Sequence, residues 1–345
     1  METTTTALLL LIGGLLAIGA VLFGRAAGRF GVPLLLIFLA VGMVAGSDGL
    51  LGIPFDDYDL AYRLGTAALV MILFDGGLQT PLESLRRVLV PAGLLASVGV
   101  LVTACMVAVI AWLLGFAWGP AMLLGAMVSS TDAAAVFSVL RGSGLQLRRR
   151  AGTTLEVESG INDPMAVILT MVLAGALVGD GVSWGLTWSI LWQTSIQLIV
   201  GVIGGFGIGW LGRWILARVH LGAGLGPVFT LALACIAYGL PSLAWGSGFL
   251  AVYLAGMMLG NAHLPYRSGL LRVHDAIAWL SQVVMFIMLG LLVFPHQLFD
   301  MLLPGVIIAV ALAVLIRPLA VALILVPCGY KRNEILFTGW VGLRG

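Results

Sequence analysis

Apolar residues in this chain occur in long runs that short polar segments separate. A bilayer is crossed by a helix of ~20 apolar residues, so runs of this kind predict membrane-spanning helices. Eleven such helices are expected, and a twelfth begins near Glu334 and is cut off at Gly345. The eleven run in chain order over Ala7–Phe23, Val32–Ala45, Ala61–Leu78, Val88–Leu114, Pro120–Leu140, Thr153–Val178, Ile190–Leu216, Leu225–Leu240, Gly248–Gly260, Ala276–Phe294 and Leu302–Val326.

Composition supports the same class of protein. Of the 345 residues, 61% are hydrophobic and only 9% are charged, whereas soluble domains carry roughly 25% charged residues. The first apolar run lacks a basic start and a small-residue cleavage site, so we interpret it as a retained helix and not as a signal peptide. The net charge of +2 gives no reason to expect a nucleic-acid partner. We therefore expect an all-α polytopic membrane protein in contact with lipid.

The basic residues predict the orientation in the membrane. Fourteen of the 17 lie in alternate loops, from Arg25 and Arg29 in the first such loop to Lys331 and Arg332 in the last. The loops between them carry aspartates, as at Asp180. Because loops rich in arginine and lysine stay in the cytoplasm, the basic loops are expected to be cytoplasmic and the N-terminus to lie outside.

Two pairs of segments indicate an internal repeat. The residues of Phe38–Gly46 resemble those of Tyr253–Asn261, and Val70–Pro81 resembles Val284–Pro295. The two segments start 32 residues apart in the first copy and 31 apart in the second. An offset of seven helices gives the copies opposite orientations, which is typical of transporters with an ion site near the membrane midplane. The other interpretation is a chance likeness of two Gly/Met/Leu-rich segments.

The fifth predicted helix contains a polar patch at Ser129, Ser130, Thr131 and Asp132. Side chains of this kind compete with the backbone for hydrogen bonds, so the patch predicts a break in the helix. A break frees backbone groups that can hold an ion. Alternatively, the serines and the threonine only pack against a neighbouring helix.

The sixth predicted helix carries a denser cluster. Glu158 and Asn162 are four residues apart and share one face, and Ser159 and Asp163 share the adjacent face. Pro164 removes a backbone donor and frees a carbonyl near Gly160. Because a buried carboxylate is costly unless paired, we predict that Glu158 pairs with Arg317, the only basic residue deep in a complete helix.

These motifs resemble a known family. Ser130–Ala133 together with Glu158–Pro164 resembles the cation:proton antiporter-1 family, which includes bacterial NhaP-type antiporters and animal sodium/proton exchangers. Phe74–Gly77 and Gly342–Gly345 are further matching segments. The resemblance implies one domain over residues 1–345, with helices one to six at 1–180, a linker helix at 188–216 and an incomplete second repeat at 221–345. It implies an inverted-repeat fold with a broken fifth helix, and later helices and any cytoplasmic regulatory domain beyond this sequence.

The resemblance also implies roles for particular residues. It implies electroneutral exchange of K⁺, or next Na⁺, for H⁺ across a bacterial inner membrane by a homodimer, with ions as substrates and no cofactor. Asp163 matches the carboxylate that binds either ion. Asn162 matches a residue that marks electroneutral members, and Ser159 and Asp132 match groups near the ion. Thr131 matches the position in the broken helix that offers its backbone carbonyl. Glu158 and Arg317 match a bracing ion pair, and Arg344 matches an arginine on the helix that crosses the fifth helix.

Some alternatives stay open. Asp75 can line an entrance to the site or cap a helix end, and the four histidines are expected in loops. A cation channel on the same fold and an inactive fragment of an antiporter are the rival functions. An enzyme is not expected, since the chain contains neither an H-E-x-x-H motif nor a P-loop, and the missing P-loop leaves no nucleotide site.

Overall fold

The fold is known from a computed structural model of the whole chain. The structure describes residues 34–131, 149–178, 184–219, 222, 224–262 and 267–342, together with isolated positions between residues 7 and 22. Within these ranges every regular element is helical and no β-strand occurs. The all-α class predicted from the sequence is therefore confirmed.

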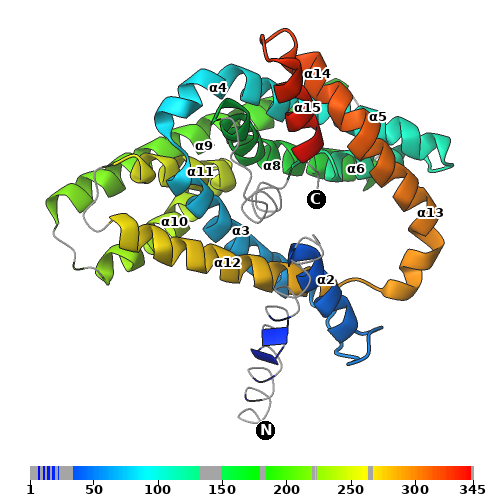
Figure 1. The fold of residues 1–345 in the computed structure, drawn as a ribbon, viewed down its shortest axis with the longest axis horizontal. Helices are drawn as coiled ribbons and strands as arrows, with labels where there is room; N and C mark the ends of the chain where they lie inside the picture. Colours follow the sequence, from blue (N-terminus) through cyan, green and yellow to red (C-terminus); the bar gives the residue numbers. More distant parts are fainter. Residues whose placement is uncertain are drawn as a thin grey trace. The chain divides into compact units, whose positions relative to one another are not determined.

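Figure 1 labels the helices along the chain. In chain order they are α2 (Leu34–Ala45), α3 (Tyr58–Gln79), α4 (Leu82–Leu94), α5 (Val100–Leu113), α6 (Trp118–Met127), α8 (Arg149–Val178), α9 (Trp184–Arg218), α10 (Leu225–Leu243), α11 (Gly248–Gly260), α12 (Arg267–Leu291), α13 (Pro295–Ala311), α14 (Arg317–Leu325) and α15 (Arg332–Val341). Two π-helical turns, η2 (Leu95–Gly99) and η3 (Leu312–Ile316), join α4 to α5 and α13 to α14.

Six helical segments in the described part of the chain are long and apolar enough to cross a membrane. The helix predicted at Gly248–Gly260 has the observed bounds of α11. Two predicted starts were six residues late, because α4 begins at Leu82 instead of Val88 and α9 at Trp184 instead of Ile190. The starts of α12 and α13 were wrong by more, since α12 begins at Arg267 instead of Ala276 and α13 at Pro295 instead of Leu302. In both helices the additional first turns contain polar residues, which hydropathy assigns to loops although they can end a membrane helix.

The π-turns interrupt two runs that the sequence predicted as single helices. Pro318 is the second residue of α14, and it has no N–H group to bond back along the helix. The wider turn η3 lies directly before Arg317, and its different hydrogen-bond spacing accommodates the donor that Pro318 lacks. The position of Arg317 is thus set by the end of a π-turn.

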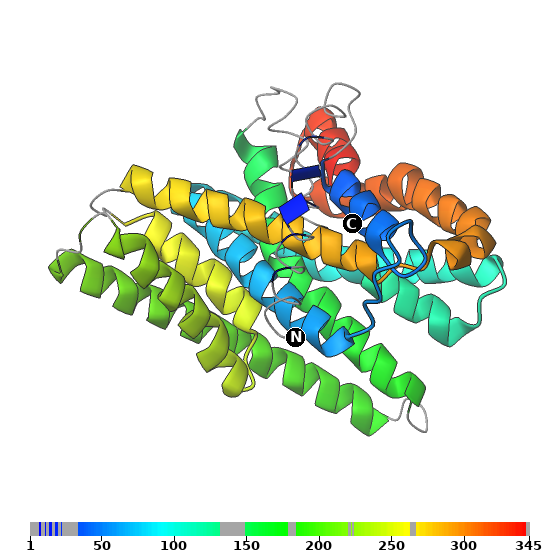
Figure 2. The same ribbon diagram turned by 90° about the horizontal axis from the view of Figure 1, so that it is seen from below.

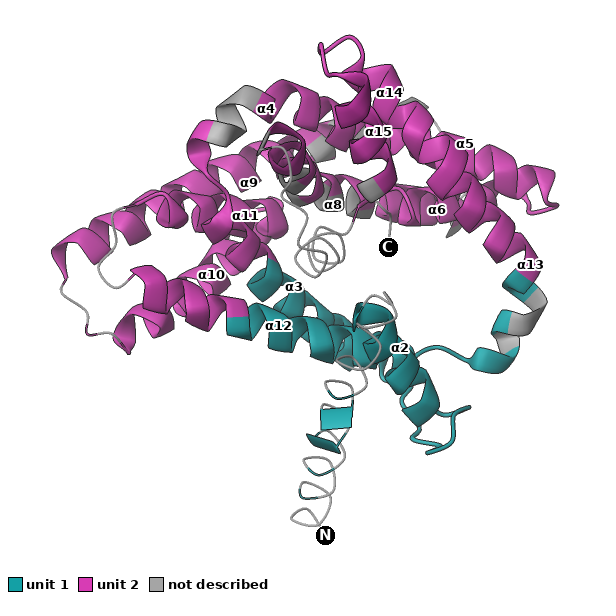
Figure 3. Cartoon of the chain, viewed as in Figure 1, with its two compact units in different colours: residues 1–72, 137–145, 276–302 teal, residues 73–136, 146–275, 303–345 magenta. Residues whose placement is uncertain are grey.

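The described chain divides into two compact units, which Figure 3 shows in different colours. In unit 1, α2 crosses α12 where two glycines meet. A Cβ atom built at Gly290 would lie 2.8 Å from the Cα of Gly42, so this crossing needs glycine. In unit 2, a Cβ at Gly256 of α11 would lie 2.5 Å from the carbonyl oxygen of Phe74 in α3. Each unit thus contains at least one crossing that is tight enough to exclude a side chain at the contact.

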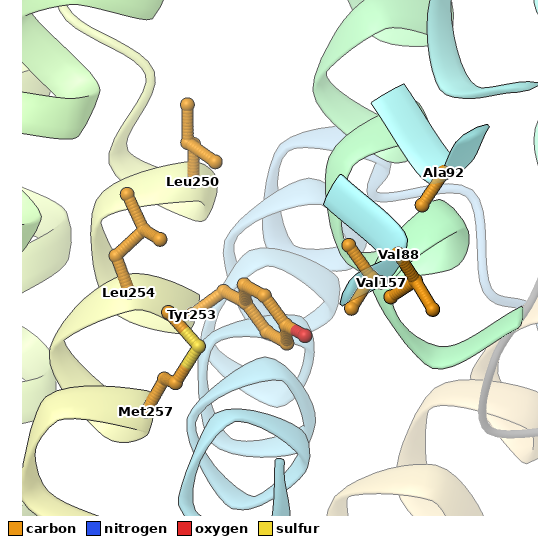
Figure 4. Close-up of a cluster of buried hydrophobic side chains, with 7 residues drawn as sticks. All are labelled: Val88, Ala92, Val157, Leu250, Tyr253, Leu254 and Met257. Atoms are coloured by element: carbon orange, nitrogen blue, oxygen red, sulfur yellow. The ribbon is translucent and has the colours of Figure 1, made fainter. Parts of the chain in front are cut away.

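Unit 2 contains the helices that carry the predicted site. Its helices α9, α10 and α11 lie side by side in both ribbon views (Figures 1 and 2). An apolar cluster joins α11 to α4 and α8 (Figure 4), and it contains Val88, Ala92, Val157, Leu250, Tyr253, Leu254 and Met257. Val157 is fully buried and directly precedes Glu158, so this cluster fixes the rotation of α8 about its axis.

Candidate functional site

The polar residues of α8 are as deeply buried as its apolar ones. Glu158 and Asn162 are 0% exposed, and Ser159 is 2% exposed. Polar groups buried this far stabilise the fold only when hydrogen bonds or ion pairs satisfy them. Their partners therefore define the site.

Thr131 contacts α8 at the end of α6. Helix α6 ends at Met127, and Thr131 lies four residues later outside any regular element, with 0% of its surface exposed. Its hydroxyl oxygen lies 2.9 Å from that of Ser159 and accepts a hydrogen bond of 2.5 Å from the side-chain amide of Asn162. Two residues of α8 thus hold the chain where it leaves α6.

The end of α6 coincides with the start of the polar patch that predicted a broken helix. Residues 132–148 lie outside the described part of the chain, so the second half of the expected broken helix stays a prediction. The expected role of the Thr131 backbone carbonyl as a ligand of the ion also stays a prediction. The hydroxyl contacts of Thr131 were not predicted.

Asn162 has a second, unused group. With its amide nitrogen bonded to Thr131, its carbonyl oxygen Oδ1 is buried and has no hydrogen-bond partner within the described residues. An unsatisfied buried acceptor costs about 1–3 kcal/mol. A site that binds a cation or a protonated group would use such an acceptor.

Glu158 and Arg317 form a buried ion pair that connects α8 to α14. The guanidinium donates two hydrogen bonds to the carboxylate, Nη1 to Oε1 at 2.6 Å and Nη2 to Oε2 at 2.8 Å. Arg317 is 1% exposed, so both charges are out of contact with solvent. The pairing predicted from the sequence is present in the structure. Because the fork-to-fork geometry neutralises both charges, Glu158 does not leave a net negative charge beside Ser159.

Of three other predicted site residues, the structure describes one in part and two not at all. Asp163 follows Asn162 in the helical backbone of α8, and its side chain lies outside the described part of the structure. Asp132 and Arg344 also lie outside the described residues. The structure therefore brings together Thr131, Glu158, Ser159, Asn162 and Arg317.

Asp75 lies one turn before the end of α3 and is 6% exposed. Its Oδ2 accepts a hydrogen bond of 2.7 Å from the side-chain amide of Gln79 in the last turn. The two roles considered for Asp75, lining an entrance and capping a helix end, remain predictions.

The prediction that the histidines lie in loops was wrong for two of them. His296 is in the first turn of α13 and pairs with Asp48. His274 is in α12, is 1% exposed, and its Nε2 lies 2.7 Å from the hydroxyl of Thr230. The sequence offered one signal for His274, because the apolar residues near it continue the helical spacing of α12 toward Arg267.

A contact between α8 and the turn after α14 was not predicted from the sequence. The guanidinium carbon of Arg150 lies 3.8 Å from the centre of the Tyr330 ring, as in a cation–π interaction. The hydroxyl of Tyr330 lies 2.9 Å from that of Thr154. These contacts attach the first turns of α8 to the α14–α15 hairpin.

An all-helical fold that combines membrane-spanning helices with a buried polar cluster and a buried ion pair is typical of ion transporters. The family model described as sodium/hydrogen exchanger, transmembrane, matches residues 14–345. The chain therefore belongs to the sodium/hydrogen exchanger family, which is a family of transporters and not of enzymes.

Relatives of known name support the NhaP type within this family. The chain is 46% identical over 339 residues to the K(+)/H(+) antiporter NhaP of Alkalimonas amylolytica, covering 98% of this chain and 58% of that protein. It is 43% identical over 338 residues to the K(+)/H(+) antiporter NhaP2 of Shewanella sp. (strain ANA-3), covering 97% and 58%. The chain thus spans 58% of the length of these relatives.

The fold is similar to that of a solved antiporter. The sodium proton antiporter MjNhaP1 of Methanocaldococcus jannaschii matches with a TM-score of 0.79 at 25% identity, covering 96% of this chain and 81% of that chain. A second structure of the same antiporter, at pH 8, matches with a TM-score of 0.78 at 24% identity, over 96% and 84% of the two chains. We take these likenesses as evidence for the fold.

Proposed function

We propose that the protein exchanges a monovalent cation for protons across a membrane. The observation that carries this proposal is the buried cluster of Thr131, Ser159 and Asn162, next to a glutamate whose charge Arg317 already neutralises. The cluster offers oxygen atoms, the ligands that hard cations prefer. It does so in apolar surroundings where any additional charge must be compensated.

Asp163 is the proposed exchange group. It follows Asn162 in the helix of α8, and its carboxylate can hold either a proton or a cation, since each neutralises the same charge. The hydroxyls of Ser159 and Thr131 and the unused Oδ1 of Asn162 are the proposed additional ligands. Loading one ion then releases the other, and this competition couples the two fluxes.

The exchange is proposed to be electroneutral. Asn162 contributes no charge, and the charge of Glu158 is balanced by Arg317. The site therefore carries the same net charge whether Asp163 binds a proton or a monovalent cation. If the empty, charged site does not cross the membrane, one cation moves for each proton.

The favoured substrate is K⁺, with Na⁺ next. This preference rests on the names of the relatives at 42–46% identity, which are K(+)/H(+) antiporters. The proposed location is a bacterial inner membrane with the N-terminus outside and the basic loops cytoplasmic, following the distribution of arginines. The proposed assembly is a homodimer, by resemblance to the family.

The test is proton flux in reconstituted vesicles with a trapped pH dye. The wild-type protein is expected to move protons when K⁺ or Na⁺ is added, and a series with Li⁺ and Rb⁺ ranks the cations. Asp163→Asn, which cannot exchange a proton near neutral pH, is expected to lose the flux. The matched control is Ser242→Ala, which changes a hydroxyl that donates to the carbonyl of Tyr238 within α10. Exchange that persists in Asp163→Asn would refute this site.

A further inference from the structure

Gly342, the residue that follows α15, lies against the guanidinium of Arg317. A Cβ atom built at Gly342 would overlap with Nη2 of Arg317 and would lie 2.9 Å from its Nε and 2.9 Å from the carbonyl oxygen of Thr338. Nη2 is the atom that donates 2.8 Å to Oε2 of Glu158. The space that a side chain at position 342 would need is thus occupied by one half of the buried ion pair.

The tip of an arginine usually moves aside at little cost, but this one is held in place. Arg317 is 1% exposed and donates two charge-assisted hydrogen bonds to a glutamate that is 0% exposed. Moving its guanidinium by the distance an added methyl requires would lengthen at least the Nη2 bond. An added side chain would therefore act on the ion pair and not only on local packing.

The backbone does not explain the glycine. Gly342 has φ −69° and ψ 55°, which is the inverse γ-turn conformation, a common one that does not require glycine. The same face of α15 carries Gly339, where a Cβ would lie 3.1 Å from the Cα of Pro318. Positions 339 and 342 together let α15 lie close to the first two residues of α14. What position 342 requires is the absence of a side chain.

The end of α15 also suits the charge it faces. The carbonyl groups of a helix C-terminus carry partial negative charge and favour a nearby cation. Gly342 is in the C-terminal cap of α15, where its N–H bonds to the carbonyl of Thr338. Arg317 is thus placed between the carboxylate of Glu158 on α8 and the negative end of α15.

We propose that Gly342 is a positioning residue for ion exchange: by lacking a side chain, it leaves the space in which Arg317 lies while it pairs with Glu158 beside Ser159. This inference rests on the proposed exchange function. It adds a third helix, α15, to the elements that set the geometry of the site. No residue of α15 was assigned to the ion pair from the sequence.

The experiment compares Gly342→Ala in two backgrounds. In the wild-type background we expect at least a tenfold loss of exchange rate and a lower thermal unfolding temperature in detergent. In the Arg317→Lys background, where Nη2 is absent, the same change is expected to lower the exchange rate less than threefold and to leave the unfolding temperature unchanged. Gly239→Ala is the control, because no atom lies within 4 Å of its added Cβ.

The outcomes separate this inference from the proposed function. Equal losses in both backgrounds, wild-type behaviour of Gly342→Ala, or an equal loss in Gly239→Ala would overturn the role of Gly342. If Gly342→Ala does not fold, Arg317→Lys must restore folding of the double variant, and failure to do so also overturns it. If the wild-type protein exchanges no ions, the proposed function fails, and the unfolding temperatures still decide whether Gly342 and Arg317 are coupled.

Discussion

The side-chain amide of Asn162 donates a hydrogen bond of 2.5 Å to the hydroxyl of Thr131, across a sequence separation of 31 residues. This bond joins α8 to the segment that follows α6, and both side chains are fully buried. An ionised carboxylate at this position could only accept from the Thr131 hydroxyl, because it has no hydrogen to donate, so the direction of this bond requires the amide.

Asn162→Ala is therefore expected to weaken cation binding. Among the described residues Thr131 would keep its contact with Ser159, and the loss of a buried hydrogen bond costs about 1–3 kcal/mol. We expect the half-saturating cation concentration to rise about tenfold, the equivalent of ~1.4 kcal/mol. Proton-flux titrations in vesicles measure this value. An unchanged half-saturating concentration would show that the bond to Thr131 does not shape the cation site.

Glu158→Gln is expected to destabilise the protein more than it would at the surface. It removes the carboxylate that pairs with Arg317 in the described part of the chain, and a buried guanidinium would be left without that counter-charge. Breaking one partner of such a pair costs about 3–5 kcal/mol. The double variant Glu158→Gln/Arg317→Met is expected to recover most of this loss, since neither charge remains. Denaturant unfolding in detergent tests both, and equal stability of wild type and Glu158→Gln would contradict the prediction.

The sequence was sufficient to predict the ion pair but not its surroundings. A single deep arginine and one glutamate in a polar cluster leave few ways to satisfy both charges, and this is why Glu158 and Arg317 could be matched over 159 positions. The resemblance marked Gly342 only as part of a matching segment, and a glycine has no side chain from which a contact with Arg317 could be predicted. Its closeness to Arg317 follows from the geometry of the α14–α15 hairpin, which appears only in the folded chain.

Helix ends were also hard to predict, because which residues are buried at a helix end depends on the folded neighbours. His274 is buried against Thr230 and Phe74, yet its neighbours Arg272 and Asp275 made the segment resemble a loop. Hydropathy averages over a window, whereas burial depends on which face of the helix meets a partner. The first turns of α12 were therefore predicted as a loop.

The predicted repeat relates the two glycine crossings to each other. Its alignment pairs Gly42 of α2 with Met257 of α11, and Gly290 of α12 with Gly76 of α3. The crossing of α2 with α12 in unit 1 thus corresponds to the crossing of α11 with α3 in unit 2, to within one residue of the observed contact at Gly77. The aligned positions share a glycine only on the side of α12 and α3, at residues 290 and 76, so we interpret the likeness as a shared need for a small residue on that one helix.

Gly256→Ala is expected to destabilise the protein. Its new Cβ would lie 2.5 Å from the carbonyl oxygen of Phe74 and 3.2 Å from the backbone nitrogen of Leu78, so α3 and α11 would have to separate. Overpacking of this kind costs about 1–3 kcal/mol. Gly93→Ala in α4, whose added Cβ meets no atom within 4 Å, is the control and should be neutral or stabilising. Thermal unfolding in detergent distinguishes the two, and equal transitions would argue against a tight crossing.

The exchange rate is expected to be independent of membrane potential. Since Glu158 and Arg317 compensate each other and Asn162 is uncharged, the loaded site carries the same charge with a cation as with a proton on Asp163. Moving a net charge across the membrane would change the energy by about 2.3 kcal/mol per 100 mV, enough for a large effect on rate. Vesicles clamped at different potentials by a gradient of a permeant anion, with fixed cation concentrations, provide the measurement. A rate that varies with potential would contradict the prediction and would require a second mobile charge in the site. Asn162→Asp introduces such a charge at a known position, so exchange by this variant is expected to depend on the membrane potential.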